Sequence, residues 1–202
     1  MPLSSRPLDV SGLPSYRFSH HSLMWWGIMG MIAIEGTVFA LSVAVYFYLW
    51  SQASRWPLST PPPDLRWGTL NVAMLLFSIL PNHWQKRAGE DGDERRIRLW
   101  LAVISLIGIV MIGIRALEFT ALNCSWDSDA YGSIVWMLLG LHTTHLVTDV
   151  YDSIVLAVLF WLPKPHEGKR HVDVSENGMY WYFVVYSWIP IYLVLYWVPR
   201  FS

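Results

Sequence analysis

Charged residues are scarce in this sequence. Asp, Glu, Lys and Arg make up 14% of its 202 residues, whereas about 25% is usual for a soluble domain. Hydrophobic residues reach 54%, and 13 residues are Trp. So few charges cannot cover a soluble protein of this size, and so much apolar surface excludes a disordered chain. Length and composition together predict one membrane domain.

Features of several common functional sites are also missing. The chain has one cysteine, Cys124, which excludes an internal disulfide and a zinc site built on cysteines. The net charge is −1 and the basic residues are scattered, so we expect no nucleic-acid partner. The sequence contains no phosphate-binding loop and no Ser-His-Asp order. The first twenty residues are polar, so we expect no cleavable signal peptide.

Long apolar runs, in contrast, are abundant. Five of them reach the length of about 17 residues that a transmembrane helix needs, and they do not alternate as the strands of a barrel would. We therefore expect an all-α, polytopic membrane protein, a bundle of five transmembrane helices that follows a cytoplasmic segment of residues 1–22. The expected spans within the single domain 23–202 are about 23–50, 67–84, 97–122, 131–162 and 180–198.

The segments between these runs are predicted to be loops. Residues 55–66 carry four prolines, residues 85–96 and 163–178 are polar and charged, and residues 123–130 contain neither Lys nor Arg. Within the spans, Pro81 is expected to end the second and Pro190 to kink the fifth.

Lys and Arg are divided unevenly between the two sides of the expected bundle. Ten of them flank the spans on the side of the N-terminus, and three lie on the other side, Arg55, Arg66 and Arg200. Because cytoplasmic loops carry the excess of Lys and Arg, we expect the N-terminus in the cytoplasm and the C-terminus in the periplasm.

Seven charged or histidine side chains fall well inside the expected spans, away from their ends, where each charge is costly. They are Glu35 in the first span, Arg115 and Glu118 in the third, and His142, His145, Asp149 and Asp152 in the fourth. At about 1.5 Å per residue, Glu35 and His142 lie at nearly the same depth, so we expect a contact that joins their spans. Arg115 and Glu118 are expected to pair along one helix, whereas Arg115 and Asp149 lie toward opposite faces of the membrane.

The polar residues of the fourth span form one stripe, because they fall within about 80° of one another around a helix. Three interpretations are open. The stripe could be a metal or haem site in which Glu35 joins His142 and His145, a proton or ion path that adds Asp149, or a structural contact between helices. The physics of the residues favours the structural contact, because polar side chains within membranes usually pair with one another.

The order of several motifs resembles subunit III of the haem–copper oxidases over nearly the whole chain. The most specific segment, YGSIVWMLLGLHTTHLV, resembles the family's Tyr-Gly-Ser followed by Gly-Phe-His-Gly-x-His-Val, with His142 and His145 on the two histidines. The first span resembles the family helix with a buried glutamate, at Glu35. RALEF resembles Gln-x-x-Glu-Tyr and places Glu118 on the glutamate.

The last span, YWYFVVYSWIPIYLVLYW, resembles the family's terminal helix, Tyr-Trp-His-Phe-Val-Asp. Departures from the family pattern are Arg115 for Gln, Tyr182 for His, Val185 for Asp and Asp149 for Gly. The chain resembles the shorter, five-helix form of the family.

This resemblance implies a non-catalytic subunit of a respiratory cytochrome c oxidase in a bacterial inner membrane. It would bind no haem, copper or other metal itself. The haem and the copper would lie in the partner subunits I and II. It would pack on subunit I, hold phospholipid in a cleft, and support proton uptake and stability during turnover. The alternatives left open are the related accessory protein of nitric oxide reductase, an independent small transporter, and a haem-binding membrane cytochrome.

Overall fold

The computed structural model describes residues 18–162 and 168–201, nearly all of them helical. Five long helices follow one another: α1 (Leu23–Gln52), α2 (Leu65–Asp91), α3 (Glu94–Thr120), α4 (Ala130–Trp161) and α5 (Gly168–Tyr192). A 3₁₀ turn, η1 (Ser19–His21), precedes α1, and a π-helical turn, η2 (Leu193–Trp197), and α6 (Val198–Phe201) continue α5. No described residue lies in a β-strand, so the predicted all-α class is confirmed.

The first four long helices each begin after a capping side chain. Ser22, Asp64, Asp93 and Asp129 accept backbone hydrogen bonds at the starts of α1, α2, α3 and α4. These caps satisfy N–H groups that have no partner in the first turn of a helix. The predicted loops 55–66 and 123–130 lie between helices except for their last one or two residues.

The predicted loop 85–96 is wrong. Helix α2 continues to Asp91 and α3 begins at Glu94, so two residues, Gly92 and Asp93, join them. Gly92 has φ 69°, the left-handed conformation that glycine adopts easily at the end of a helix. The polar residues before Gly92 are helical because α2 continues beyond its apolar segment. Polar residues at the end of a membrane helix indicate contact with water and do not by themselves indicate a loop.

Two further expectations about where helices begin and end also fail. Helix α5 begins at Gly168 instead of residue 180, while residues 163–167 of the predicted loop lie outside the described residues. Pro81 lies inside α2 and does not end it. Next to it, the Asn82 amide donates a hydrogen bond of 2.8 Å to the carbonyl oxygen of Gly178 and holds α2 against α5.

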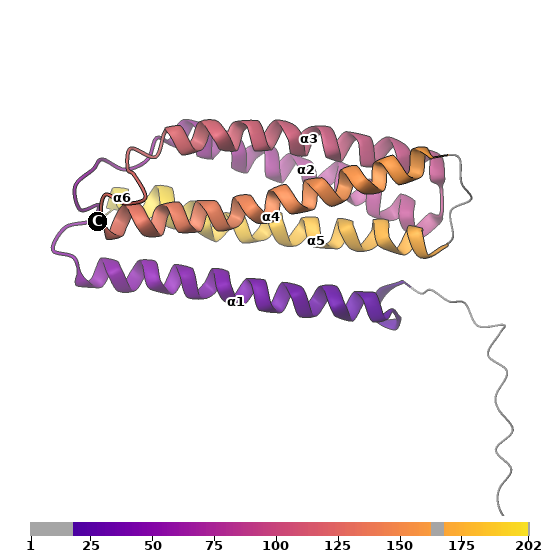
Figure 1. The fold of residues 1–202 in the computed structure, drawn as a ribbon, viewed down its shortest axis with the longest axis horizontal. Helices are drawn as coiled ribbons and strands as arrows, with labels where there is room; N and C mark the ends of the chain where they lie inside the picture. The colour runs from indigo at the N-terminus through magenta and orange to yellow at the C-terminus, as the bar shows by residue number, and fades with distance from the viewer. Residues whose placement is uncertain (1–17, 163–167, 202) are drawn as a thin grey trace, which may run out of the picture.

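Helices α2 to α5 form an antiparallel bundle, and α1 lies along one side of it, against α4 and α5 (Figure 1). Gly108 on α3 lies so close to Val150 on α4 that a Cβ atom would overlap the valine side chain. Gly68 on α2 is covered in the same way by the ring of Tyr196. Small residues at these points let neighbouring helices approach closely, as they do in membrane proteins.

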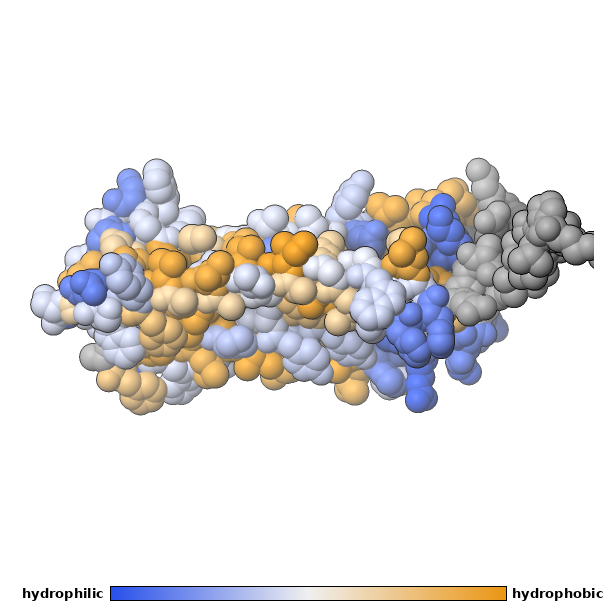
Figure 2. Space-filling view, turned by 90° about the horizontal axis from the view of Figure 1, so that it is seen from below, coloured by the Kyte–Doolittle hydropathy of each residue, from blue (hydrophilic) through white to orange (hydrophobic). Residues whose placement is uncertain are grey.

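Four helical rods among the described residues are long and apolar enough to cross a membrane: α1, α3, α4 and the continuous rod Gly168–Phe201. On the face shown in Figure 2, apolar and weakly polar residues cover the middle, and the most hydrophilic residues gather toward the two ends. The chain is thus a multi-pass membrane protein. Helix α2 is not among the four, and its polar composition is considered below.

Candidate functional site

A buried ion pair occupies the interior of the bundle. Arg115 and Glu118 on α3 are each 1% exposed, and Nη1 of the arginine lies 2.9 Å from Oε2 of the glutamate. The predicted pairing along one helix is confirmed. Because each charge would be costly to bury alone, the pair needs further partners that satisfy its remaining polar atoms.

Those partners come from every other helix of the antiparallel bundle. The Asn71 amide on α2 donates to Oε2 of Glu118 over 2.9 Å, and the Tyr196 hydroxyl on η2 donates to Oε1 over 2.5 Å. The guanidinium lies 3.9 Å from the centre of the Trp188 ring on α5 and 3.1 Å from Nδ1 of His142 on α4. We call these six residues the Arg115 cluster. It joins α2, α3, α4 and the rod that begins with α5.

The expected contact between Glu35 and His142 is wrong. His142 is fully buried and turned toward the bundle, where Nδ1 meets Arg115 and Nε2 lies 2.9 Å from the carbonyl oxygen of Val184. An arginine can only donate, so Nδ1 of His142 is the acceptor. Its Nε2 then carries the hydrogen and donates a hydrogen bond to the carbonyl oxygen of Val184. His142 lies on the side of α4 that faces the bundle, whereas Glu35 on α1 approaches α4 on the side of His145.

Glu35 instead meets the other histidine of the stripe. Its Oε2 accepts a 2.5 Å hydrogen bond from the Tyr180 hydroxyl on α5 and lies 3.6 Å from Nε2 of His145 on α4. The ring of Phe39 packs beside His145, with 4.9 Å between ring centres. Glu35 therefore connects α1 to both α4 and α5.

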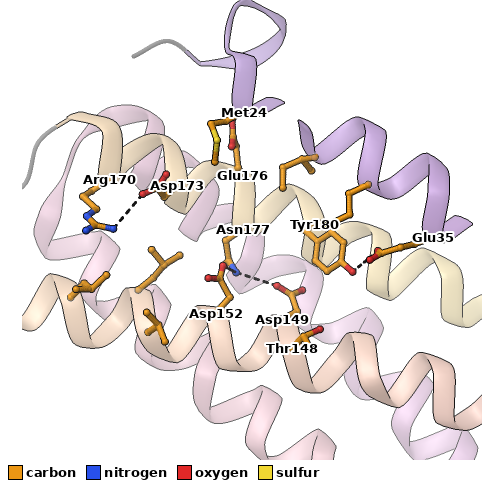
Figure 3. Close-up of a pocket in the computed structure, with 15 residues that line it drawn as sticks. Met24, Glu35, Thr148, Asp149, Asp152, Arg170, Asp173, Glu176, Asn177 and Tyr180 are labelled. Atoms are coloured by element: carbon orange, nitrogen blue, oxygen red, sulfur yellow. Dashed lines mark hydrogen bonds and ion pairs between the residues drawn. The ribbon is translucent and has the colours of Figure 1, made fainter. Parts of the chain in front are cut away.

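An open cleft of about 520 Å³ lies beside Glu35 and is lined by α1, α4 and α5 (Figure 3). At its centre, the Asn177 amide donates to Oδ1 of Asp149 and to Oδ2 of Asp152, each over 3.1 Å. Asp149 is 2% exposed, while Asp152 is exposed in the isolated chain and lines the cleft. Arg115 and Asp149 do not meet, as their depths predict.

The predicted stripe on α4 therefore serves two places. His142 belongs to the Arg115 cluster, whereas His145, Asp149 and Asp152 face α1 or the cleft. The partners on α5, Asn177 among them, were missed because residues 163–178 looked like a loop. The sequence does contain a sign that these residues are helical: Arg170, Asp173, Asn177 and Tyr180 follow one another at a spacing of three or four residues.

Both ring nitrogens of His142 are occupied by contacts within the protein. A metal ligand needs a ring nitrogen with a free lone pair, and Nδ1 of His142 is held by Arg115 while its Nε2 bonds Val184. In His145, Nδ1 donates to the carbonyl oxygen of Leu141, and Nε2 lies 3.6 Å from Oε2 of Glu35 on α1. Within residues 18–162 and 168–201, no three His, Cys, Asp or Glu side chains are grouped to hold a metal ion.

Cys124 lies half-buried in the segment between α3 and α4. Burial, aided by the negative charge of Asp129, raises the pKa of its thiol to about 11. The thiol is therefore protonated at neutral pH and a poor nucleophile.

Comparisons with known proteins point to one family. The family model described as cytochrome c oxidase subunit III matches residues 62–200. A cytochrome c oxidase subunit 3 of Synechocystis is 23% identical over 198 residues, which cover 95% of this chain and 84% of the relative. A probable cytochrome c oxidase subunit 3 of Mycobacterium tuberculosis is 29% identical, covering 85% of this chain and 86% of the relative.

The similarity extends to mammals. Cytochrome c oxidase subunit 3 of Rattus norvegicus is 26% identical over 144 residues, which cover 70% of this chain and 55% of the rat protein. The family match spans more than half of the chain and includes α2 to α5. The chain belongs to the cytochrome c oxidase subunit III family, and its role is that of a subunit III in an oxidase complex.

Proposed function

We propose that this chain is a non-catalytic subunit that packs on subunits I and II of a respiratory oxidase in a bacterial inner membrane. The observation that carries the proposal is the Arg115 cluster. Its ion pair on α3 is bound by side chains of the neighbouring helices, which suits a structural subunit. Haem and copper are then held by the partner subunits, and this chain supports proton uptake and stability during turnover.

We infer that α2 is a fifth transmembrane helix. Its polar side chains point into the bundle: Asn71, Ser78, Asn82 and Gln85 are fully buried. Its large apolar side chains point outward, and Phe77 and Leu80 are 59% and 54% exposed. Such an inverted pattern is favourable in lipid, where exposed apolar groups cost nothing and polar groups must find internal partners.

An odd number of spans separates the two ends of the chain. Seven Lys and Arg of the described residues lie at the end of the bundle where α1 begins: Lys86, Arg87, Arg95, Arg96, Arg98, Lys169 and Arg170. Three lie at the opposite end, Arg55, Arg66 and Arg200. This asymmetry supports a cytoplasmic N-terminus and a periplasmic C-terminus. Arg6, Arg17 and Lys164, counted in the prediction, lie outside the described residues.

The cleft between α1, α4 and α5 is the proposed phospholipid site. It is large enough for part of a lipid molecule, and its lining includes the apolar side chains of Met24, Ile28 and Met31 on α1. A lipid held there would fill the space between α1 and the bundle.

The proposal is tested by purifying the oxidase from cells with and without this chain. We expect the haem and copper spectra and the initial turnover rate to be retained without it, while activity is lost several-fold faster during sustained turnover. Loss of the haem or copper signal on removal of the chain would contradict a non-catalytic role.

A further inference from the structure

A second groove, of about 440 Å³, lies on the surface between α1 and α5. Helix α1 contributes Gly36 and Ala40, four residues apart, and α5 contributes Tyr186 and Pro190. The rest of the lining is apolar except for Ser187, whose hydroxyl already donates to a carbonyl oxygen of its own helix. None of the described residues that line this groove also lines the cleft between α1, α4 and α5, so the two are separate features.

The groove lies midway along the bundle. Near the start of α2, the hydroxyl of Thr69 lies 2.7 Å from that of Tyr192 on α5. Toward the other end of α2, Asn82 meets the carbonyl oxygen of Gly178. At about 1.5 Å per residue, Tyr186 lies about 9 Å from the first contact and about 12 Å from the second. It is thus in the middle of the proposed transmembrane bundle, away from the interfaces where tyrosine is usually found.

Two polar groups of Tyr186 are open to a partner at this depth. The side chain is 56% exposed, and no hydrogen bond joins its hydroxyl to another residue of 18–162 or 168–201. Its carbonyl oxygen lacks the usual helical donor, because Pro190, four residues later, has no N–H. Acyl chains can bond neither group, so contact with lipid alone would be costly here. An occupant that makes hydrogen bonds is favoured.

The wall of the groove on α1 is shaped for a second helix. A Cβ atom at Gly36 would meet only the Phe183 ring, at 3.7 Å, so the chain itself leaves the space above Gly36 and Ala40 open. Small residues four apart on a transmembrane helix let a neighbouring helix approach closely. Because backbone in contact with lipid must satisfy its own hydrogen bonds, a segment that enters this groove within the membrane is helical.

We propose that the groove receives a transmembrane helix of a neighbouring oxidase subunit, one that carries a hydroxyl or amide side chain at the depth of Tyr186. That side chain donates to the carbonyl oxygen of Tyr186 and accepts from its hydroxyl, while its helix packs on Gly36 and Ala40. Apolar residues of the same helix fill the rest of the groove. This inference rests on the proposed packing of the chain on partner subunits and adds the face that it uses.

The test places a photo-crosslinking residue at single positions of this chain in the intact oxidase complex. Tyr186→p-benzoylphenylalanine lies in the groove, and Ile109→p-benzoylphenylalanine, at a site on α3 that is 53% exposed, is the matched control. Mass spectrometry after irradiation identifies what is joined to the chain. We expect position 186 to crosslink to a transmembrane helix of a partner subunit several-fold more than position 109. Val43→p-benzoylphenylalanine, on the facing wall, repeats the test if the Tyr186 variant fails to assemble.

A packing variant gives an independent readout. Ala40→Leu fills the groove, and Ala116→Leu, at an exposed position of α3, is its control. Because overfilling a packed contact is costly, we expect Ala40→Leu to release the partner subunit about tenfold faster in detergent. The control should leave the rate of release unchanged.

Crosslinks from the groove to lipid alone overturn the inference, as does equal crosslinking to the partner from position 109. Equal rates of release in Ala40→Leu and Ala116→Leu also count against it. In each of these cases, a wild-type chain that still co-purifies with its partner subunits leaves the proposed function standing. A wild-type chain that co-purifies with no partner subunit overturns both.

Discussion

Nη2 of Arg115 lies 3.1 Å from Nδ1 of His142 and thereby ties α3 to α4 inside the bundle. From the sequence, His142 was a candidate metal ligand. The contact makes it part of the Arg115 cluster, which joins helices. It also sets the side of α4 that faces the bundle, and so leaves His145 to meet Glu35 on α1.

Replacing Arg115 with Gln should lower the free energy of unfolding by about 3–5 kcal/mol, because Glu118 would remain buried without its cation. In the double variant Arg115→Gln/Glu118→Gln no charge is left unpaired, so we expect a much smaller loss. Thermal release of this chain from the purified complex measures both. Equal losses in the single and double variants would argue against a true ion pair.

Glu35→Gln should weaken the attachment of α1, because Gln has no charge to strengthen the hydrogen bond from Tyr180 or to attract His145. The expected cost is about 1–3 kcal/mol, as for a hydrogen bond to a charged group. Tyr180→Phe removes one of the same contacts and should give a similar loss. Subunit retention, turnover lifetime and thermal stability are the measurements. If all three stay unchanged in Glu35→Gln, Glu35 does not hold α1.

Gly108→Ala should destabilise the packing of α3 on α4 by about 1–3 kcal/mol, the usual cost of overfilling a packed interior. Gly113→Ala is the matched control, because a Cβ atom there meets nothing within 4 Å. Thermal unfolding of the two variants should separate them clearly. Similar melting temperatures would show that α3 and α4 are less closely packed than Val150 implies.

Alkylation of Cys124 should be slow at neutral pH. With a pKa of about 11, roughly one thiol in ten thousand is ionised at pH 7, and the thiolate is the reactive form. The rate of reaction with iodoacetamide should therefore rise about tenfold per pH unit up to pH 10. Glutathione under the same conditions is the control and should level off earlier. A plateau for Cys124 below pH 9 would contradict the raised pKa.

The sequence predicts the helices well where apolar runs are long, as in α1, α3 and α4. It fails at the ends of α2 and α5, because the polar ends of these helices carry exposed residues such as Arg87 and Lys169. Apolar length alone says nothing of where such a helix stops. The stop depends on local features, such as the left-handed Gly92 and the Asp93 cap.

Contacts within one helix are predictable, and Arg115 with Glu118 is the example. Contacts between helices need the rotation of each helix as well as the depth of each residue. Glu35 and His142 lie at similar depths, but the rotation of α4 about its axis turns His145 toward Glu35. The rotation of α4 is set by groups on other helices, including Asn71 and Tyr196, whose positions a single sequence does not reveal.

Purification of the complex through an affinity tag on this chain tests the central claim most directly. We expect two larger partner subunits to co-purify in equal amounts, with haem and copper in the complex. Recovery of the chain alone, or with a partner that contains haem and non-haem iron but no copper, would contradict its place in a cytochrome c oxidase.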